Sequence, residues 1–428
     1  MTDWFKKLGF CQVGVTCVLL VFLMETTSFG QDASEILQLE VYPPEFTVIG
    51  SREQVQIVVT GKISDQQSID LTRLVSYKVE PPDLASVDSQ GVVTPKQDGS
   101  GVIQVSYKGI RQEARLSTQG ITQSQFVSFD YHALPILAQS GCSGGSCHGA
   151  PHGKAGFRLS LFGSDRELDR VSLTMQQAGR RINPIEPAKS LLLLKPTSEF
   201  AHQGGKRFDK ETKQYRLLHD WIAEGARTDI DEPECTGIKV FPTSGRLLKF
   251  PNQNQQLSVI ASFADGSTRD VTHLAKYEVS DPLVADVTRG GWVQGLDRGE
   301  SAVIVRFLNH IQTPLMTFVR DIEGFVWDDP APANYVDQHV YEKLKQLQYK
   351  PSPQCDESTF LRRVYLDVIG LLPTQEEINV YFANESENRR ADLIDQLLKR
   401  PEYAKFWAQK WGDLLRVSTK LIGVAGVH

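Results

Sequence analysis

The 428-residue chain has little cysteine and methionine and no excess of basic charge. Its six cysteines exclude a disulfide scaffold, because such proteins are short and cysteine-dense. The 46 lysines and arginines are outnumbered by 52 acidic residues, which gives a formal net charge of −6. That balance leaves no basic footprint for nucleic acid, so we expect no nucleic-acid partner. With 40% hydrophobic and 23% charged residues the chain has a globular composition, and its length predicts several domains.

The first thirty residues have the pattern of a signal peptide. Lys6-Lys7 precedes an apolar run over residues 8–24, and a small-residue cleavage pattern follows at residues 28–30. The alternative is an uncleaved membrane anchor, but spanning usually takes roughly 20 apolar residues and this run is short. We therefore predict a signal peptide at residues 1–30 and an exported protein, in the periplasm or at the cell surface.

An internal repeat organises the chain. Residues 70–93 (DLTRLVSYKVEPPDLASVDSQGVV) align without a gap to residues 270–293 (DVTHLAKYEVSDPLVADVTRGGWV). Both copies contain short alternating segments separated by Gly, Asp, Pro and Ser, which is typical of an antiparallel sandwich. We predict two all-β immunoglobulin-like sandwiches, at residues 36–120 and 236–322. The identical Asp and Tyr residues of the repeat are interpreted as turn caps and core residues.

Two other segments have helical periodicity. Residues 125–232 end in KETKQYRLLHDWIAEGA, with apolar residues at helical spacing and Gly225 as a C-cap. After a Pro-rich linker at residues 323–334, residues 335–420 consist of amphipathic runs broken by prolines, in which Asp356 and Thr374 are predicted N-caps. The fold class predicted is multidomain: two all-β immunoglobulin-like sandwiches, a small mainly α domain between them, and an all-α C-terminal domain.

The stretch SGCSGGSCHGAPHGKAGF, residues 140–157, contains candidate residues for a functional site. In c-type cytochromes two cysteines bind haem covalently and the next histidine ligates the iron, usually as C-x-x-C-H. Here four small residues separate Cys142 from Cys147, and His148 follows. From these residues alone a Cys142–Cys147 disulfide is as well supported as haem, because export favours oxidation. A zinc site that adds His152 and a catalytic cysteine are weaker alternatives.

The segment that contains this motif resembles the planctomycete-type cytochrome c domains. The resemblance rests on element order: the cysteine pair with its histidine, then RINPIEPAKSLLLLKP at residues 181–196, then a loop, then a helix ending W-I-x-x-G-A at residues 221–226. It implies a mainly α cytochrome c-like domain at residues 125–232 that carries haem c. Cys142 and Cys147 would hold this haem covalently.

The resemblance also implies the axial ligands of that haem. Many such domains place a methionine before prolines in the loop that precedes the last helix, as the distal iron ligand. In this chain the loop reads FAHQGGKRF and offers His202 instead. It therefore implies coordination by His148 and His202, which would give a six-coordinate, low-potential iron without an open position, suited to electron transfer.

Two further resemblances concern the flanking parts. The repeats resemble bacterial immunoglobulin-like group-2 domains, most clearly at Ala285-Asp286-Val287 and residues 295–305, which implies a spacer or adhesion module. Residues 335–420 resemble the helical domain of unknown function that accompanies planctomycete cytochrome modules in large exported proteins. A further long domain usually follows in that family, so we expect a truncated gene product or a helical part that stands alone.

These expectations lead to an exported haem c protein that acts in electron transfer or as a redox accessory. Its redox partner is not identifiable, and cell-surface or polysaccharide-associated proteins are candidate partners. The alternative is a haem-free surface adhesion or scaffold protein with a Cys142–Cys147 disulfide. An enzyme is less favoured, because no paired carboxylates with hydrolase spacing are recognisable.

Other polar and sulfur-containing residues near the motif have simpler interpretations. Met175 is expected to fill a core, His152 to be a solvated loop residue, and Cys235 and Cys355 to be bystanders in linker-like stretches. His219 lies in the last helix of the segment and is as readily exposed as functional. Four cations are candidates for pairing with haem propionates, although surface charge explains them equally: Lys154, Arg158, Arg180 and Arg181.

Overall fold

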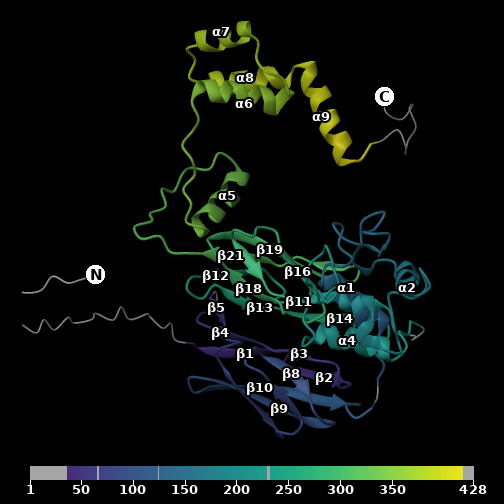
Figure 1. Ribbon diagram of the computed structural model, residues 1–428. Helices are drawn as coiled ribbons and strands as arrows, with labels where there is room; N and C mark the ends of the chain where they lie inside the picture. The colour runs from purple at the N-terminus through teal and green to yellow at the C-terminus, as the bar shows by residue number, and fades with distance from the viewer. Residues whose placement is uncertain (1–35, 65–66, 124, 229–231, 418–428) are drawn as a thin grey trace, which may run out of the picture. The chain divides into compact units, whose positions relative to one another are not determined.

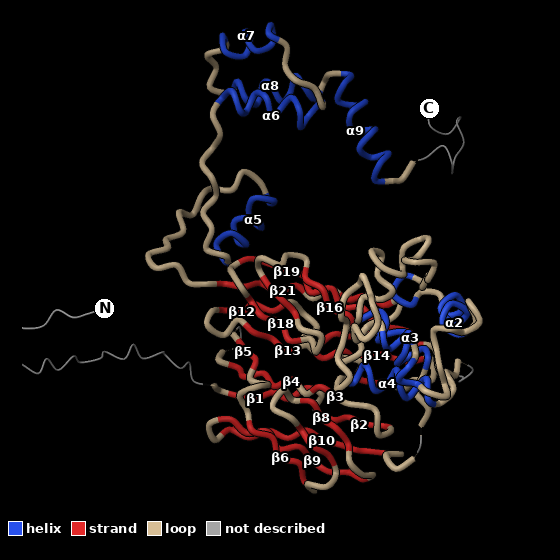
Figure 2. Tube along the Cα trace, in the orientation of Figure 1, coloured by secondary structure: helices blue, strands red, loops and turns tan. Residues whose placement is uncertain are grey.

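The computed structural model describes residues 36–64, 67–123, 125–228 and 232–417. The chain forms two compact units, which meet in sequence between residues 325 and 326. The first unit contains the sheets and a helical segment, and the second is helical (Figures 1 and 2). The expectation of β-rich N-terminal and middle parts with a helical C-terminal part is therefore confirmed. The predicted signal peptide lies outside the described residues.

The first sandwich has three small sheets with the strand orders β1-β4-β5, β2-β10-β9-β6 and β3-β8-β7. Their inward-facing valines, leucines and isoleucines form one buried cluster. The strands are β1 (Gln38–Tyr42), β2 (Glu45–Ile49), β3 (Val55–Gln56), β4 (Val58–Lys62), β5 (Ser68–Asp70), β6 (Ser76–Glu80), β7 (Ala85–Val87), β8 (Val92–Pro95), β9 (Gly99–Tyr107) and β10 (Ile110–Gln119).

The second sandwich repeats this topology strand for strand, with the orders β11-β14-β15, β12-β21-β19-β16 and β13-β18-β17. One short strand, β20, pairs with β19 in addition. The strands are β11 (Cys235–Phe241), β12 (Arg246–Lys249), β13 (Asn254–Gln256), β14 (Ser258–Phe263), β15 (Thr268–Asp270), β16 (Lys276–Val279), β17 (Ala285–Val287), β18 (Trp292–Gly295), β19 (Gly299–Phe307), β20 (His310–Gln312) and β21 (Leu315–Val319).

The sandwiches are not purely antiparallel, which corrects the sequence-based expectation. In each copy the second strand runs parallel to the last one, β2 to β10 and β12 to β21. After β1, which is antiparallel to β4, the chain passes Pro43-Pro44 and enters the other sheet as β2. Because the chain keeps its direction when it changes sheets, β2 meets β10 in parallel. Alternating sequence patterns cannot distinguish this arrangement from an antiparallel one.

The repeated aspartates join the two sandwiches to each other. Asp70 Oδ2 accepts hydrogen bonds from the backbone N–H of Gln256 and the side chain of Gln255, each at 2.8 Å. Asp270 Oδ2 accepts reciprocally from the backbone N–H of Gln56, also at 2.8 Å. Burial raises the pKa of each carboxyl to about 6 and the N–H donors oppose the rise, so both are ionised at neutral pH. The aspartates thus do more than cap their own turns.

Replacing Asp70 by alanine is expected to lower the free energy of unfolding of the first unit by about 2–5 kcal/mol. The change leaves the Gln255 and Gln256 donors without their acceptor, together with the backbone N–H of Thr72, and each buried orphan costs about 1–3 kcal/mol. Chemical denaturation of the full chain measures the effect. Asp286→Ala is the matched control, because that exposed carboxylate accepts, among the described residues, only from its neighbour Val287. Equal unfolding midpoints for the two variants would contradict this role.

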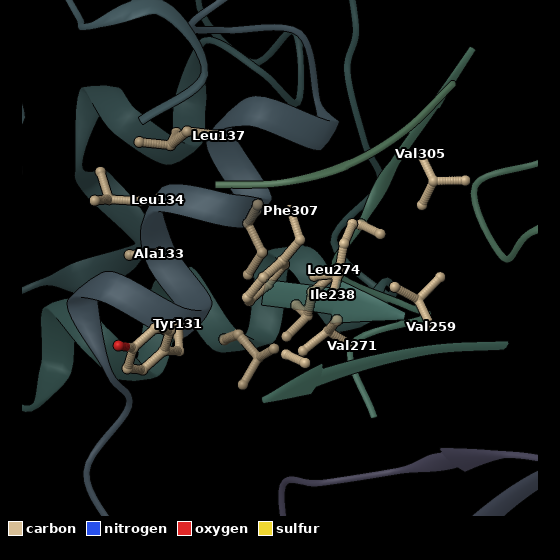
Figure 3. Packing of buried hydrophobic residues seen from close by; sticks show 14 of the residues in the cluster. Tyr131, Ala133, Leu134, Leu137, Ile238, Val259, Val271, Leu274, Val305 and Phe307 are labelled. Atoms are coloured by element: carbon tan, nitrogen blue, oxygen red, sulfur yellow. The ribbon is translucent and has the colours of Figure 1, made fainter. Parts of the chain in front are cut away.

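The helical segment between the sandwiches shares its hydrophobic core with the second sandwich. One buried cluster runs from Val127 through Trp221 to Phe318 without a break. Figure 3 shows Tyr131 and Leu134 on the helical side of this cluster, with Phe307 and strand residues such as Val259 on the other. The segment comprises a π-helical turn (Phe129–Ala133), α1 (Leu134–Gln139), α2 (Arg166–Thr174), α3 (Leu191–Leu194), α4 (Lys213–Ala223) and two 3₁₀ turns (Leu161–Gly163 and Pro187–Lys189).

The second unit contains five described helices, and residues of α6, α7, α8 and α9 form a small core of its own. Asp356 caps α6, and Thr374 forms the predicted capping box with Glu377 of α7. Arg390 and other neighbours hold the pKa of Glu357 down to about 2. No helix in the described ranges is long and apolar enough to cross a membrane. The helices are α5 (Tyr335–Gln346), α6 (Glu357–Ile369), α7 (Gln375–Ala383), α8 (Arg389–Leu398) and α9 (Pro401–Leu414).

Candidate functional site

The helical segment of the first unit contains a cavity of about 690 Å³, a size common for small-molecule and cofactor sites. The motif residues Cys142, Cys147 and His148 line it, and His202 lines it from the loop between α3 and α4. The residues predicted from the motif and from the ligand loop therefore share one cavity. Its apolar lining comes from Leu137, Phe157, Leu191, Leu192 and Pro196.

The four residues between the two cysteines form a closed loop. The backbone N–H of Cys147 donates to Gly144 O at 2.9 Å, and that of His148 donates to Cys142 O at 3.0 Å. Gly149 lies so close that a Cβ there would be 2.2 Å from Ser143 O. Small residues allow this tight return, so the longer spacing bulges outward and still leaves both cysteines at the cavity.

Substitution of Gly149 by alanine is expected to open this loop and to lower the free energy of unfolding of the first unit by about 1–3 kcal/mol, the usual cost of overpacking. The added methyl would overlap the carbonyl of Ser143, which is backbone and cannot rotate away. Gly145→Ala is the matched control, since its Cβ would meet only Leu161 at 3.8 Å. Thermal unfolding of both variants measures the difference. A Gly149→Ala protein as stable as Gly145→Ala would show that the loop does not need glycine at position 149.

The two histidines are oriented by their own hydrogen bonds. His148 Nδ1 is 2.9 Å from Phe157 O, and His202 Nδ1 is 3.0 Å from Gly205 O. The hydrogen bonds of 2.9 and 3.0 Å are both made through Nδ1, and His148 also interacts with the backbone of Lys154. A histidine that donates from one ring nitrogen to a carbonyl keeps the other available for a metal, the usual arrangement around metal-ligating imidazoles.

The imidazole rings of His148 and His202 have centroids 6.4 Å apart and planes inclined by 10°. With metal–nitrogen bonds of about 2 Å, rings at this separation could both reach one metal ion. Burial lowers the pKa of His148, and the nearby Arg181 guanidinium lowers it further. The neutral imidazole, the form that ligates metals, is therefore favoured.

The formally charged side chains that line the cavity, among the residues described, are all cationic. Arg207 Nη2 lies 3.6 Å from Cys147 Sγ. Burial raises the pKa of the Cys142 thiol to about 11, while the Arg207 guanidinium opposes the rise. Such a cavity favours a ligand with carboxylate groups and a large apolar body. The lining cations are Lys154, Arg180, Arg181, Lys195 and Arg207.

The geometry gives less support to the disulfide and zinc alternatives. Cys142 and Cys147 are free thiols in the structure. His152, the fourth ligand of the zinc alternative, is exposed and does not line the cavity. The described residues contain no group of three or more His, Cys, Asp or Glu side chains placed to hold a metal ion.

Several expectations for single residues need correction or refinement. Met175 is 56% exposed, so the expectation that it fills a core is wrong; it follows the end of α2, on the surface. Cys235 is a buried residue at the start of β11 and not part of a linker. Cys355 is a partly exposed free thiol, and His219 lies half-exposed on α4 beside Asp220.

The candidate cations divide in the structure. Arg180 and Lys154 line the cavity, whereas Arg158 is exposed and does not. Arg181 is buried and donates to the carbonyl oxygen of Ser172 at 2.7 Å, so part of its role is structural. Lys195 and Arg207 also line the cavity and were not predicted from the sequence. The sequence feature that could have indicated them is their position, because Lys195 lies shortly before the ligand loop and Arg207 lies within it.

The C-terminal helical part matches a known family model. Residues 335–422 match PSCyt2, described as a protein of unknown function (DUF1549). This confirms the resemblance of the helical part to that associated domain. No curated protein matches the chain significantly.

Surface proteins are among the solved structures with a weak likeness to the chain. Domains 5-6 of the S-layer protein SbsC are 11% identical, with 67% of this chain and 99% of that chain covered and a TM-score of 0.27. BT4661, a SusE-like surface-located polysaccharide-binding protein from the Bacteroides thetaiotaomicron heparin utilisation locus, is 9% identical. That match covers 65% of this chain and 34% of that chain with a TM-score of 0.13. At these scores the likeness assigns neither fold nor function.

Proposed function

We propose that this chain is an exported c-type haem protein that acts in electron transfer or as a redox accessory. Cys142 and Cys147 would hold the haem covalently, and His148 and His202 would ligate its iron. The observation that carries the proposal is the pair of near-parallel imidazoles, 6.4 Å apart, at the cavity that both cysteines line.

The residues present fit such a group in three respects. Both imidazoles have Nε2 available, because each Nδ1 is engaged by a backbone carbonyl. Apolar side chains such as Phe157 and Leu192 supply surface for a porphyrin, and Arg180 and Lys195 supply charge for its carboxylates. When bound, a six-coordinate haem supplies one-electron chemistry and leaves no open position for oxygen.

The remaining parts of the chain fit a protein that works outside the cytoplasm. The predicted signal peptide favours export, and the two immunoglobulin-like sandwiches would serve as spacer or adhesion modules. The second sandwich shares its core with the segment that contains the cavity, so it would also support the haem site mechanically. A redox partner among cell-surface or polysaccharide-associated proteins is consistent with this placement.

The proposal is tested by expressing the full chain with a cytochrome c maturation system and recording a pyridine haemochrome spectrum. Covalent haem with a low-spin spectrum is expected. Peptide mapping under non-reducing conditions runs in parallel, since a Cys142–Cys147 disulfide is incompatible with two thioethers. Absence of covalent haem while both thiols are reduced would contradict the proposed haem function. A mapped disulfide would favour the haem-free adhesion or scaffold protein.

A further inference from the structure

The side chain of Arg207 links the loop that carries His202 to the cysteine motif. Its guanidinium reaches Cys147, where Nη2 lies 3.6 Å from Sγ. Two glycines leave room for it: a Cβ at Gly141 would be 3.4 Å from Nη1, and a Cβ at Gly204 would be 3.3 Å from Nη2. The guanidinium therefore lies between the residue before Cys142 and the residues after His202.

The backbone of Arg207 is fixed from two sides. Its N–H donates to Pro196 O at 2.7 Å, which ties it to the end of the α3 turn. Its carbonyl accepts from Arg289 Nη2 at 2.8 Å, and Arg289 belongs to the turn between β17 and β18 of the second sandwich. The second sandwich thus contributes directly to the position of the ligand loop.

His202 does not hold itself against the motif. Its Nδ1 hydrogen bond goes to Gly205, within the same turn, so it orients the ring relative to the loop alone. Position 204 has no side chain that could hold the loop against the motif. It also has no room for one, because a Cβ there would be 2.7 Å from Cε1 of the His202 ring. The separation between the two imidazoles then depends on what holds the loop to the motif.

We propose that Arg207 is a positioning residue that holds the His202 loop against the cysteine motif, with Arg289 of the second sandwich anchoring its backbone. The inference rests on the proposed haem function. Sulfur accepts the guanidinium hydrogen bond as a thiol and as a thioether, so the brace would persist after haem attachment. Loss of the brace should weaken coordination by His202 while both thioethers keep the haem in place.

The first test uses the matured full chain and asks whether carbon monoxide can displace the distal ligand. The Arg207→Gln protein is expected to retain covalent haem and to bind carbon monoxide in the ferrous state roughly 10-fold or more readily, the lower end of the loss caused by removing an outer-shell partner of a ligand. Arg207→Lys, which keeps the charge without the fork, should be intermediate. Arg289→Gln should shift in the same direction by less.

Arg158→Gln is the matched control, because Arg158 is exposed, does not line the cavity and makes no contact with the cysteines or His202 among the described residues. It is expected to bind carbon monoxide as the unmodified protein does. If Arg207→Gln and Arg158→Gln behave alike, Arg207 is not a positioning residue.

A second measurement separates this inference from the haem proposal. In haem-free protein the backbone amides of residues 197–207 should exchange with deuterium faster in Arg207→Gln than in Arg158→Gln, since the brace is present without haem. Equal exchange overturns the inference even if haem attaches. Faster exchange together with no covalent haem in the unmodified chain would overturn the proposed function and leave the bracing role standing.

Discussion

Replacing both Cys142 and Cys147 by serine is expected to abolish covalent haem completely while the protein still folds. A serine hydroxyl forms no thioether with a haem vinyl group, and serine is close to cysteine in size. His148 and His202 remain in the double variant, so any haem that binds should be extractable with acid and organic solvent. Haem staining of a denaturing gel and the pyridine haemochrome of the protein fraction measure the loss.

Single variants and a distant cysteine sharpen this test. Cys142→Ser and Cys147→Ser should each retain one thioether, visible as a shift of the haemochrome band because one vinyl group stays unsaturated. Cys235→Ser is the control, since that thiol lies in β11 and donates to the nearby Gly237 carbonyl. Covalent haem that survives in the double variant would show that neither thiol is an attachment point.

The β-rich character and the duplication of the sandwich were accessible to sequence analysis because their signals are local, whereas the parallel pairs β2/β10 and β12/β21 were not. Alternation with period two marks a strand by itself, and a gapless repeat such as residues 70–93 against 270–293 predicts that two copies share one fold. The helix caps at Asp356 and Thr374 were also predictable, because each cap involves residues only three positions apart. Patterns that involve residues close together in sequence can be recognised without knowledge of the tertiary structure.

What joins the modules could not be read from the sequence. The hydrogen bond from Gln256 to Asp70 spans 186 residues, and the aspartate has the same residue type whether it caps its own turn or bridges to a neighbour. The core shared by Leu134 and Phe307 likewise depends on how the segments pack. Alternation within a strand reports that a face is buried, but not which partner buries it.

The candidate site shows the same division. A motif and a loop resemblance were enough to name His148 and His202, and the structure brings their rings to one cavity. Arg207 was missed because a single arginine in a polar loop has no distinguishing pattern. Met175 was misassigned, because a methionine near the end of an amphipathic helix is compatible with either face until the packing is known.

Exchange of His202 for methionine is expected to keep the haem attached and to raise its reduction potential. Attachment depends on Cys142 and Cys147, so a change at the distal side leaves it intact. A thioether ligand favours ferrous iron more than an imidazole does, and axial ligands set haem potentials over about 0.8 V. The potential of His202→Met should rise by a substantial part of that range. Spectroelectrochemical titration measures it.

The control for this change is His152→Met, which alters an exposed histidine of the motif loop that does not line the cavity. Its potential and spectrum should equal those of the unmodified chain. If His202→Met also keeps an unchanged bis-histidine spectrum, another residue ligates the iron. The Nδ1 bond from His202 to Gly205 would then merely stabilise a turn. Comparison of the two variants therefore shows whether His202 ligates the iron or is only a loop residue, as His152 is expected to be.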